Sequence, residues 1–245
     1  MGAHGSRCRP EVGAVLIETE ARRRDSLYGR RKGKPLSPRR ERLMAELLPR
    51  LAIGGDAPLA DLPSLFPGHP SRVNLEIGFG GGEHLVAEAL RLSDEGFIGV
   101  EPFLNGMAKA LAAVDDNAVG NLRLFGGDAS VLLDHLPPGS LARVELLYPD
   151  PWPKKRHWKR RFVSPENLDR IARALKSGGV FRFVSDIPAY VEWTLLSLGR
   201  DDRFQWTAER AADWLHPFAH WPGTRYEAKA LAAGRVPTYL EFQRR

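Results

Sequence analysis

The chain has 245 residues, of which 43% are hydrophobic and 27% are charged, and this ordinary globular mixture excludes a fibrous or wholly disordered protein. An excess of 36 Lys and Arg over 30 Asp and Glu gives a net charge of +6, which favours polyanionic partners or an anionic membrane surface. The single cysteine, Cys8, excludes an intramolecular disulfide and a cysteine-based zinc site, so we expect no metal and a cytoplasmic location. The apolar run Val12–Ile17 is too short to cross a membrane.

The N-terminal part, residues 1–37, is rich in Gly, Arg and Pro and shows no helical or strand periodicity. We predict a disordered basic arm there, followed by a single domain over residues 38–245. The basic residues gather at Arg22–Arg42 and again at Lys154–Arg161. Leucines recur on one helical face between Pro38 and Leu51, and this spacing predicts a first helix.

The central part alternates short apolar runs with helix-length segments, which predicts an α/β domain with a mostly parallel, doubly wound sheet. A helix over Ala189–Leu198, another near Glu209 and a last strand over Pro237–Phe242 are expected to follow. The five central strands are predicted at Val73–Ile77, Phe97–Val100, Leu122–Phe125, Val144–Tyr148 and Val180–Val184.

A glycine-rich loop follows the first predicted strand, where Rossmann-like domains bind a nucleotide. Gly78 and Gly80 would let the backbone approach a ligand, and Glu101, at the end of the second strand, would accept hydrogen bonds from a ribose diol. Together they indicate an adenosine-bearing ligand. The alternative is that the glycines only form a tight turn and that Glu101 is a surface acid.

Glu76, just before the glycine loop, distinguishes between two kinds of ligand. A nicotinamide dehydrogenase keeps this position suited to a pyrophosphate, which a carboxylate would repel. The same carboxylate suits the ammonium and sulfonium charges of S-adenosylmethionine. Asp128, after the third strand, would accept from the adenine amine, although a helix N-cap is an equally good interpretation of Asp128 alone.

The segment after the fourth predicted strand combines an acid, aromatic residues, prolines and a basic run. Asp150 and Trp152 lie among three prolines that stiffen the backbone, and six Lys or Arg residues follow within eight positions. Such cations contact phosphates without reading sequence, and a tryptophan can stack on a base. A solvated loop is the alternative for the basic run, but its position beside the ligand crevice favours an RNA contact.

These motifs resemble the bacterial tRNA (guanine-N7)-methyltransferase family from about Leu27 to the C-terminus. The similarity is carried by the stretches at residues 28–34, 76–80 and 149–157, and the last of these is close to diagnostic. The resemblance implies a Rossmann-like class I S-adenosylmethionine-dependent methyltransferase with an antiparallel C-terminal strand. It implies methylation of the guanine 7-nitrogen in the variable loop of tRNA, at guanine(46).

The resemblance also assigns roles to individual residues. It implies that Asp150 is catalytic and that the cofactor is held by Glu76, Gly78, Gly80, Glu101, Asp128 and Asp150. It implies substrate contacts by Lys154, Asp186, Thr224, Arg225, Tyr226 and Glu227, and RNA contacts by Arg156, His157, Trp158, Lys159, Arg160 and Arg161. Trp158 stands where the family often has histidine, and the segment at 224–227 varies the usual Thr-Lys-Phe-Glu.

The guanine 7-nitrogen carries a lone pair and no proton, so we expect alignment and electrostatics rather than a strong base to promote transfer. Asp150 would orient the guanine and offset its developing positive charge. Asp186 would hold a donor on the guanine edge, or else cap a helix. The basic arm at Arg22–Lys34 would add affinity for RNA.

Two alternatives to guanine methylation remain at this point. Asp150-Pro151-Trp152 faintly resembles the loop of enzymes that methylate exocyclic amines. The chain could instead be an RNA-binding module without catalytic activity, although the presence of all four acids argues against this. We expect no obligatory protein partner and either a monomer or a homodimer.

Overall fold

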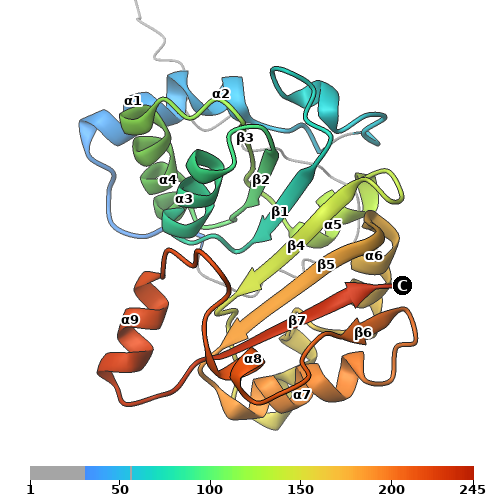
Figure 1. Ribbon diagram of the computed structural model, residues 1–245. Helices are drawn as coiled ribbons and strands as arrows, with labels where there is room; N and C mark the ends of the chain where they lie inside the picture. The colour runs from blue at the N-terminus through green and yellow to red at the C-terminus, as the bar shows by residue number, and fades with distance from the viewer. Residues whose placement is uncertain (1–30, 56) are drawn as a thin grey trace, which may run out of the picture.

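A computed structural model describes residues 31–55 and 57–245 (Figure 1). Seven strands form one sheet in the order β3-β2-β1-β4-β5-β7-β6, in which β1 to β5 are parallel and β7 runs antiparallel to both β5 and β6. The strands are β1 (Val73–Ile77), β2 (Gly96–Val100), β3 (Leu122–Phe125), β4 (Leu141–Leu147), β5 (Leu175–Ser185), β6 (Phe204–Trp206) and β7 (Thr238–Arg244). This confirms the predicted α/β class and the antiparallel C-terminal strand.

Helices cover both faces of the sheet, as continuous apolar strands require. Their bounds are α1 (Pro38–Glu46), α2 (Leu48–Leu51), α3 (Glu83–Arg91), α4 (Leu104–Asn117), α5 (Ala129–His135), α6 (Pro165–Ala174), α7 (Pro188–Leu198), α8 (Ala212–Leu215) and α9 (Arg225–Ala232), with short 3₁₀ helices η1 (Pro63–Leu65) and η2 (Lys155–Arg160). One apolar layer joins α1, α3 and α4 to the sheet, and the other joins α5, α6 and α7 to the opposite face.

The five central strands were predicted correctly, with β4 and β5 beginning earlier than expected. The predicted first helix is interrupted at Leu47, because Pro49 has no N–H to continue the hydrogen-bond pattern. The helix predicted near Glu209 corresponds to α8, which begins at Ala212 and spans four residues. Strand β6 and helix α9 were not predicted.

The predicted arm lies mostly outside the described residues, so its disorder and its affinity for RNA stay predictions. Its last part is described and contacts the start of α4. Leu104 N–H donates to Arg31 O at 2.9 Å, Gly33 N–H donates to Asn105 Oδ1 at 2.6 Å, and Asn105 Nδ2 donates to Lys34 O at 2.7 Å. Residues 31–34 therefore lie beside the helix that follows Glu101 in the chain.

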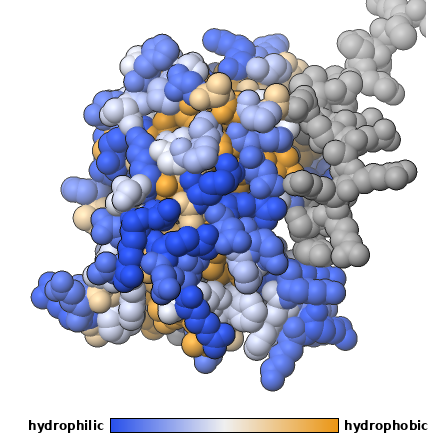
Figure 2. Space-filling model, turned by 90° about the vertical axis from the view of Figure 1, so that its right-hand side faces the viewer, coloured by the Kyte–Doolittle hydropathy of each residue, from blue (hydrophilic) through white to orange (hydrophobic). Residues whose placement is uncertain are grey.

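The surface agrees with a core buried inside a polar shell. On the face shown in Figure 2, hydrophilic side chains cover most of the area and apolar ones show in smaller areas between them. Across the described part of the chain, every helix is too short or too polar to span a membrane.

Candidate active site

The glycine loop at the carboxyl end of β1 has the backbone geometry that glycine alone adopts easily. Gly78, Gly80 and Gly82 have φ angles of 72°, 59° and 79°, in the left-handed region that penalises a side chain. A Cβ on Gly106, in the first turn of α4, would lie 2.2 Å from Gly80 O. The loop is therefore packed closely between the sheet and α4, and its backbone is open to a ligand only on its remaining side.

Glu101, after β2, holds this loop in place. Its Oε2 accepts from Gly80 N–H at 2.6 Å and its Oε1 accepts from Phe103 N–H at 2.9 Å. Burial raises the pKa of Glu101, the two backbone amides and Arg225 lower it, and the charge of Asp150 raises it. Glu101 thus connects the glycine loop to the start of α4, while Asp150 and Arg225 are close enough to act on its charge.

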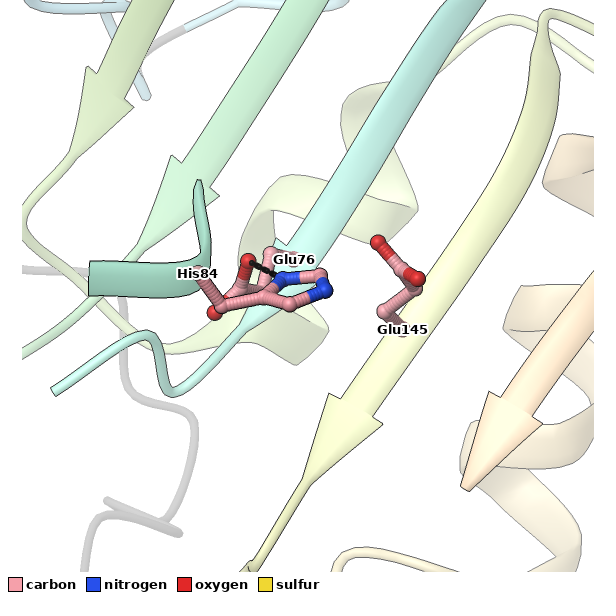
Figure 3. A group of neighbouring side chains, drawn as sticks. All are labelled: Glu76, His84 and Glu145. Atoms are coloured by element: carbon pink, nitrogen blue, oxygen red, sulfur yellow. Dashed lines mark hydrogen bonds and ion pairs between the residues drawn. The ribbon is translucent and has the colours of Figure 1, made fainter. Parts of the chain in front are cut away.

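Glu76, the acid before the loop, is 4% exposed and lies in β1 beside β4. Its Oε2 is 2.8 Å from Nδ1 of His84, and the imidazole of His84 lies between the carboxylates of Glu76 and Glu145 (Figure 3). Within the described residues, Glu76 Oε1 accepts no hydrogen bond. This oxygen is therefore available to a cationic group entering from the glycine loop.

Asp128 and Asp186 follow β3 and β5, and each has a partner within the protein. Asp128 caps α5, because its Oδ1 accepts from Ser130 N–H at 2.9 Å, so the N-cap interpretation is correct as far as geometry goes. Asp186 does not cap α7. Its Oδ2 instead accepts from Arg235 Nε at 2.5 Å. Neither contact tests the ligand contacts predicted for these two acids.

The loop after β4 carries Asp150 in an exposed position within strained backbone. Tyr148 and Trp152 on either side have φ angles of 49° and 43°, which bulky residues adopt only where the surroundings impose them. The charge of Asp150 acts on both Glu101 and Tyr190. Asp150 therefore lies near Glu101 and is exposed to solvent.

Most of the basic run after this loop is exposed and interleaved with aromatic rings. Lys154, Lys155, Arg156 and Lys159 are exposed. Arg160 lies over the Trp152 ring at 5.0 Å, and the Trp152 and His157 rings are 5.9 Å apart. Burial and the neighbouring arginines lower the pKa of His157. The run therefore presents a cationic surface directly beside Asp150.

Arg161 differs from the rest of the run, because it is only 2% exposed. Its Nε donates to Pro151 O and its Nη1 to Ala189 O, both at 3.0 Å. Its guanidinium packs on the rings of Trp158 and Tyr190 at 4.8 Å and of Trp193 at 5.4 Å. Arg161 therefore supports the loop next to Asp150, and this placement does not favour the predicted RNA contact.

The segment 224–227 begins α9, which lies beyond the ends toward which β4 and β5 point (Figure 1). Thr224 and Glu227 form a capping box, and Glu227 also accepts from Trp221 Nε1 at 2.7 Å and from the Tyr239 hydroxyl. Glu227 is 8% exposed and Tyr226 is 40% exposed. Glu227 thus fixes the segment from inside, while Tyr226 faces outward.

Two contacts bring this distant segment to the cofactor side. The Tyr226 ring stacks on Tyr148 with centroids 6.4 Å apart. A Cβ on Gly80 would lie 3.1 Å from Arg225 Nη2 and 3.2 Å from the Tyr226 ring. Segments near residues 80, 101, 150 and 225 therefore lie close together. Asp186 pairs with Arg235, and its charge acts on Tyr148 in the same region.

Sequence reasoning missed several residues of this region. His84, Arg143 and Glu145 form buried polar contacts around Glu76, and Trp221 lies against His84 with ring centroids 4.7 Å apart. Charged residues inside the apolar run of β4 were an available signal, because a buried charge needs a partner. Nothing in the local sequence indicated which partners these charges would find.

The groups around the glycine loop fit the cationic amino-acid end and the ribose of S-adenosylmethionine. The unpartnered Oε1 of Glu76 suits an ammonium group, and the open backbone at Gly78 suits a flat or extended ligand. One ligand atom from each of Glu76, His84 and Glu145 lies within 4.8 Å of the others, a spacing that would also admit a metal ion. Arg143 at 3.3 Å and Arg182 at 3.6 Å already place positive charge on Glu145.

Two solved structures share this fold. The 16S rRNA methyltransferase KamB superposes with a TM-score of 0.53 at 18% identity, over 71% of this chain and 88% of that one. TrmN from Thermus thermophilus gives a TM-score of 0.51 at 15% identity, over 72% of this chain and 45% of that one. With the strand order above, these likenesses show the class I S-adenosylmethionine-dependent methyltransferase fold.

Sequence comparison gives the family within this class. A family model described as "Putative methyltransferase" matches residues 70–239. The tRNA (guanine-N(7)-)-methyltransferase of Azorhizobium caulinodans is 58% identical over 231 residues, which are 94% of this chain and 99% of that protein. The enzyme of the same name from Rhizobium meliloti is 55% identical over 94% of this chain and 100% of its own length. The chain belongs to the tRNA (guanine-N7)-methyltransferase family.

Proposed function

We propose that this protein transfers a methyl group from S-adenosylmethionine to the 7-nitrogen of a guanine in tRNA. The observation that carries the proposal is the position of Asp150, which is exposed and lies between Glu101, beside the glycine loop, and a surface of exposed cations. The relatives named above, similar over nearly their whole length, support the choice of tRNA and of the guanine 7-nitrogen. The variable-loop guanosine is proposed on the resemblance alone.

The residues that would hold the cofactor are assigned by position. Glu76 would bind the ammonium group through Oε1, and Gly78 and Gly80 would line its path with backbone. Glu101 would accept hydrogen bonds from the ribose hydroxyls through the carboxylate lone pairs that its two backbone contacts do not use. Asp128 would accept from the adenine amine while it caps α5. When bound, the cofactor supplies a methyl group already activated by the sulfonium charge.

The chemical task left to the protein is small. The guanine 7-nitrogen attacks with its own lone pair and loses no proton, so no general base is needed. Methylation leaves the guanine positively charged, and a carboxylate beside it becomes more favourable as that charge develops. Asp150 would orient the guanine and offset this charge, and the strained backbone at Tyr148 and Trp152 would hold the carboxylate in its direction.

The RNA would be held by charge and by stacking. Lys154 would contact the substrate next to Asp150, and Arg156, His157, Trp158, Lys159 and Arg160 would follow the RNA backbone. Tyr226 and Arg225 face the glycine loop from α9 and suit a base or a phosphate. Thr224 and Glu227 would act by fixing this segment. Asp186 would contact the substrate only where its pairing with Arg235 leaves lone pairs free.

The first test is methyl transfer from labelled S-adenosylmethionine to unmodified bulk tRNA, followed by nucleoside analysis of the digested product. We expect the label in 7-methylguanosine. Label in another nucleoside, for example one methylated on an exocyclic amine, would support methyltransferase activity but contradict transfer to the guanine 7-nitrogen. Binding of S-adenosylmethionine without incorporation into any tRNA nucleoside would reject the proposed substrate.

A further inference from the structure

A row of charged side chains runs across the sheet on the face that carries Glu76. Glu76 in β1 is the register partner of Glu145 in β4, Glu145 that of Arg182 in β5, and Arg182 that of Glu241 in β7. Glu76 and Glu145 are 4% and 2% exposed. Leu75 and Ile77, which flank Glu76 in β1, belong to the apolar core on the opposite face of the sheet. Two buried carboxylates thus lie side by side, which requires compensating positive charge.

The arginines around the row are already engaged. Arg182 donates from Nε to Glu241 at 2.8 Å and has Nη1 3.6 Å from Glu145. Arg143 donates from Nη2 to Glu88 at 2.9 Å and has Nε 3.3 Å from Glu145. Arg91 pairs with Glu88 at 2.8 Å. Within the described residues this cluster therefore holds four carboxylates and three guanidinium groups, which leaves one negative charge uncompensated.

His84 occupies the place where that charge is missing. It is 3% exposed, and Figure 3 shows its ring between Glu76 and Glu145, with Nδ1 2.8 Å from Glu76 Oε2. Trp221 covers the ring with centroids 4.7 Å apart and is anchored by Glu227, so no solvent replaces these contacts. Burial lowers the pKa of His84, but Glu76, Glu145 and Glu88 outweigh burial and raise it above the ordinary value. Burial likewise raises the pKa of Glu76 against the opposing effect of His84.

We propose that His84 is a positioning residue whose proton holds Glu76 in place, and that this Glu76–His84 pair releases a proton when the cationic end of S-adenosylmethionine binds. The inference rests on the proposed role of Glu76 in binding the ammonium group. A cation at Glu76 Oε1 takes over the compensation that the imidazolium supplied, so the proton and the ligand compete for the same negative charge. The Glu76 carboxylate and the imidazole titrate together, and the released proton belongs to the pair.

The linkage fixes the sign of the effect. Because the ligand-bound form holds fewer protons than the free form, affinity for S-adenosylmethionine rises with pH over the range in which the pair titrates. The rise is at most about tenfold per pH unit for one proton. Stability runs the other way. The raised pKa of His84 means that its stabilising effect is complete below about pH 6.5 and is lost as pH rises through the pKa of the folded state.

The experiment compares the full-length wild type with His84→Asn, whose amide replaces Nδ1 as a donor but carries no charge. Isothermal titration with S-adenosylmethionine in buffers of different ionisation enthalpy counts the protons released, and the ammonium group of the ligand contributes equally to both proteins. We expect the wild type to release a fraction of a proton more than His84→Asn, and its affinity to rise more steeply with pH. The matched control is His69→Asn, at an exposed histidine whose φ of 49° asparagine accepts, and it should behave as wild type.

The outcomes separate this inference from the proposed function. If Glu76→Gln binds S-adenosylmethionine as tightly as wild type, the assignment of Glu76 fails. If Glu76→Gln weakens binding while His84→Asn releases as many protons as wild type, the role of His84 is overturned and that of Glu76 stands. His84→Gln repeats the comparison should the asparagine variant not fold. Should a chelator lower the melting temperature of wild type but not of His84→Asn, the cluster holds a metal ion and the inference is wrong.

Discussion

The two regions of the candidate site differ in how far their charged side chains are buried. On the cofactor side, Glu76 and Glu101 are buried and bound to the protein itself, through His84 and through the amides of Gly80 and Phe103. On the proposed RNA side, Asp150 and most of the cations that follow it are exposed, and the segment is held by strained backbone and by the buried Arg161. A small ligand needs a prepared, dry cavity, whereas a large polyanion needs accessible charge.

The largest expected effect is a loss of turnover when the charge of Asp150 is removed. Asp150→Asn keeps the shape of the side chain but removes the charge, so the methylated guanine is no longer compensated in the transition state. We expect turnover to fall by about 10²–10³ while affinity for S-adenosylmethionine changes little, measured by single-turnover kinetics and by equilibrium binding. Asp94→Asn, at an exposed acid before β2, is the control. Near-normal turnover of Asp150→Asn would contradict the charge-based role.

A change at Glu101, on the proposed cofactor side, should lower the affinity for S-adenosylmethionine rather than the turnover. Glu101→Ala leaves the buried N–H groups of Gly80 and Phe103 without acceptors, and we expect S-adenosylmethionine to bind about 10–100 times more weakly. Urea unfolding should show a loss of about 2 kcal/mol for the same reason. Glu101→Gln retains one acceptor and should lie between the two. Equal binding by all three proteins would mean that Glu101 holds neither the loop nor the ribose.

A substitution at Arg161 tests whether this residue holds the loop of Asp150 or contacts the RNA. Arg161→Lys keeps the charge but cannot bridge Pro151 O and Ala189 O while packing a flat group on the three rings. We expect turnover to fall about tenfold because Asp150 loses its alignment, with the salt dependence of tRNA binding unchanged. A flatter salt dependence in Arg161→Lys would show that Arg161 contacts phosphate after all.

The smallest effects should come from the exposed cations. Lys155→Ala and Lys159→Ala each remove a proposed phosphate contact, so tRNA affinity should fall a few-fold, with KM affected more than kcat. The slope of log affinity against log salt should flatten by about 0.7–0.9 for each phosphate that the protein no longer neutralises. Filter binding over a salt series measures this directly. Unchanged slopes would mean that these lysines contact no phosphate and that the basic run is an ordinary solvated surface.

Much of the fold followed from local pattern. The predicted bounds of β1 and β3 match their strands residue for residue, because most of their positions are apolar and buried by helices on either face. Strand β6 and helix α9 escaped prediction because short elements at the edge of a domain depend on what they pack against. The glycines were informative because a left-handed backbone restricts the residue type at its own position.

The sequence by itself determined the class of sheet, the position of the glycine loop, the acids that follow the strands and the family. Only the tertiary structure decided that Glu76 is paired with His84, that Asp186 is paired with Arg235 and that Arg161 lies beneath the loop rather than on it. Residue type and spacing determine local conformation, whereas the partner of a buried charge is set by strand register and by loops that return from distant parts of the chain.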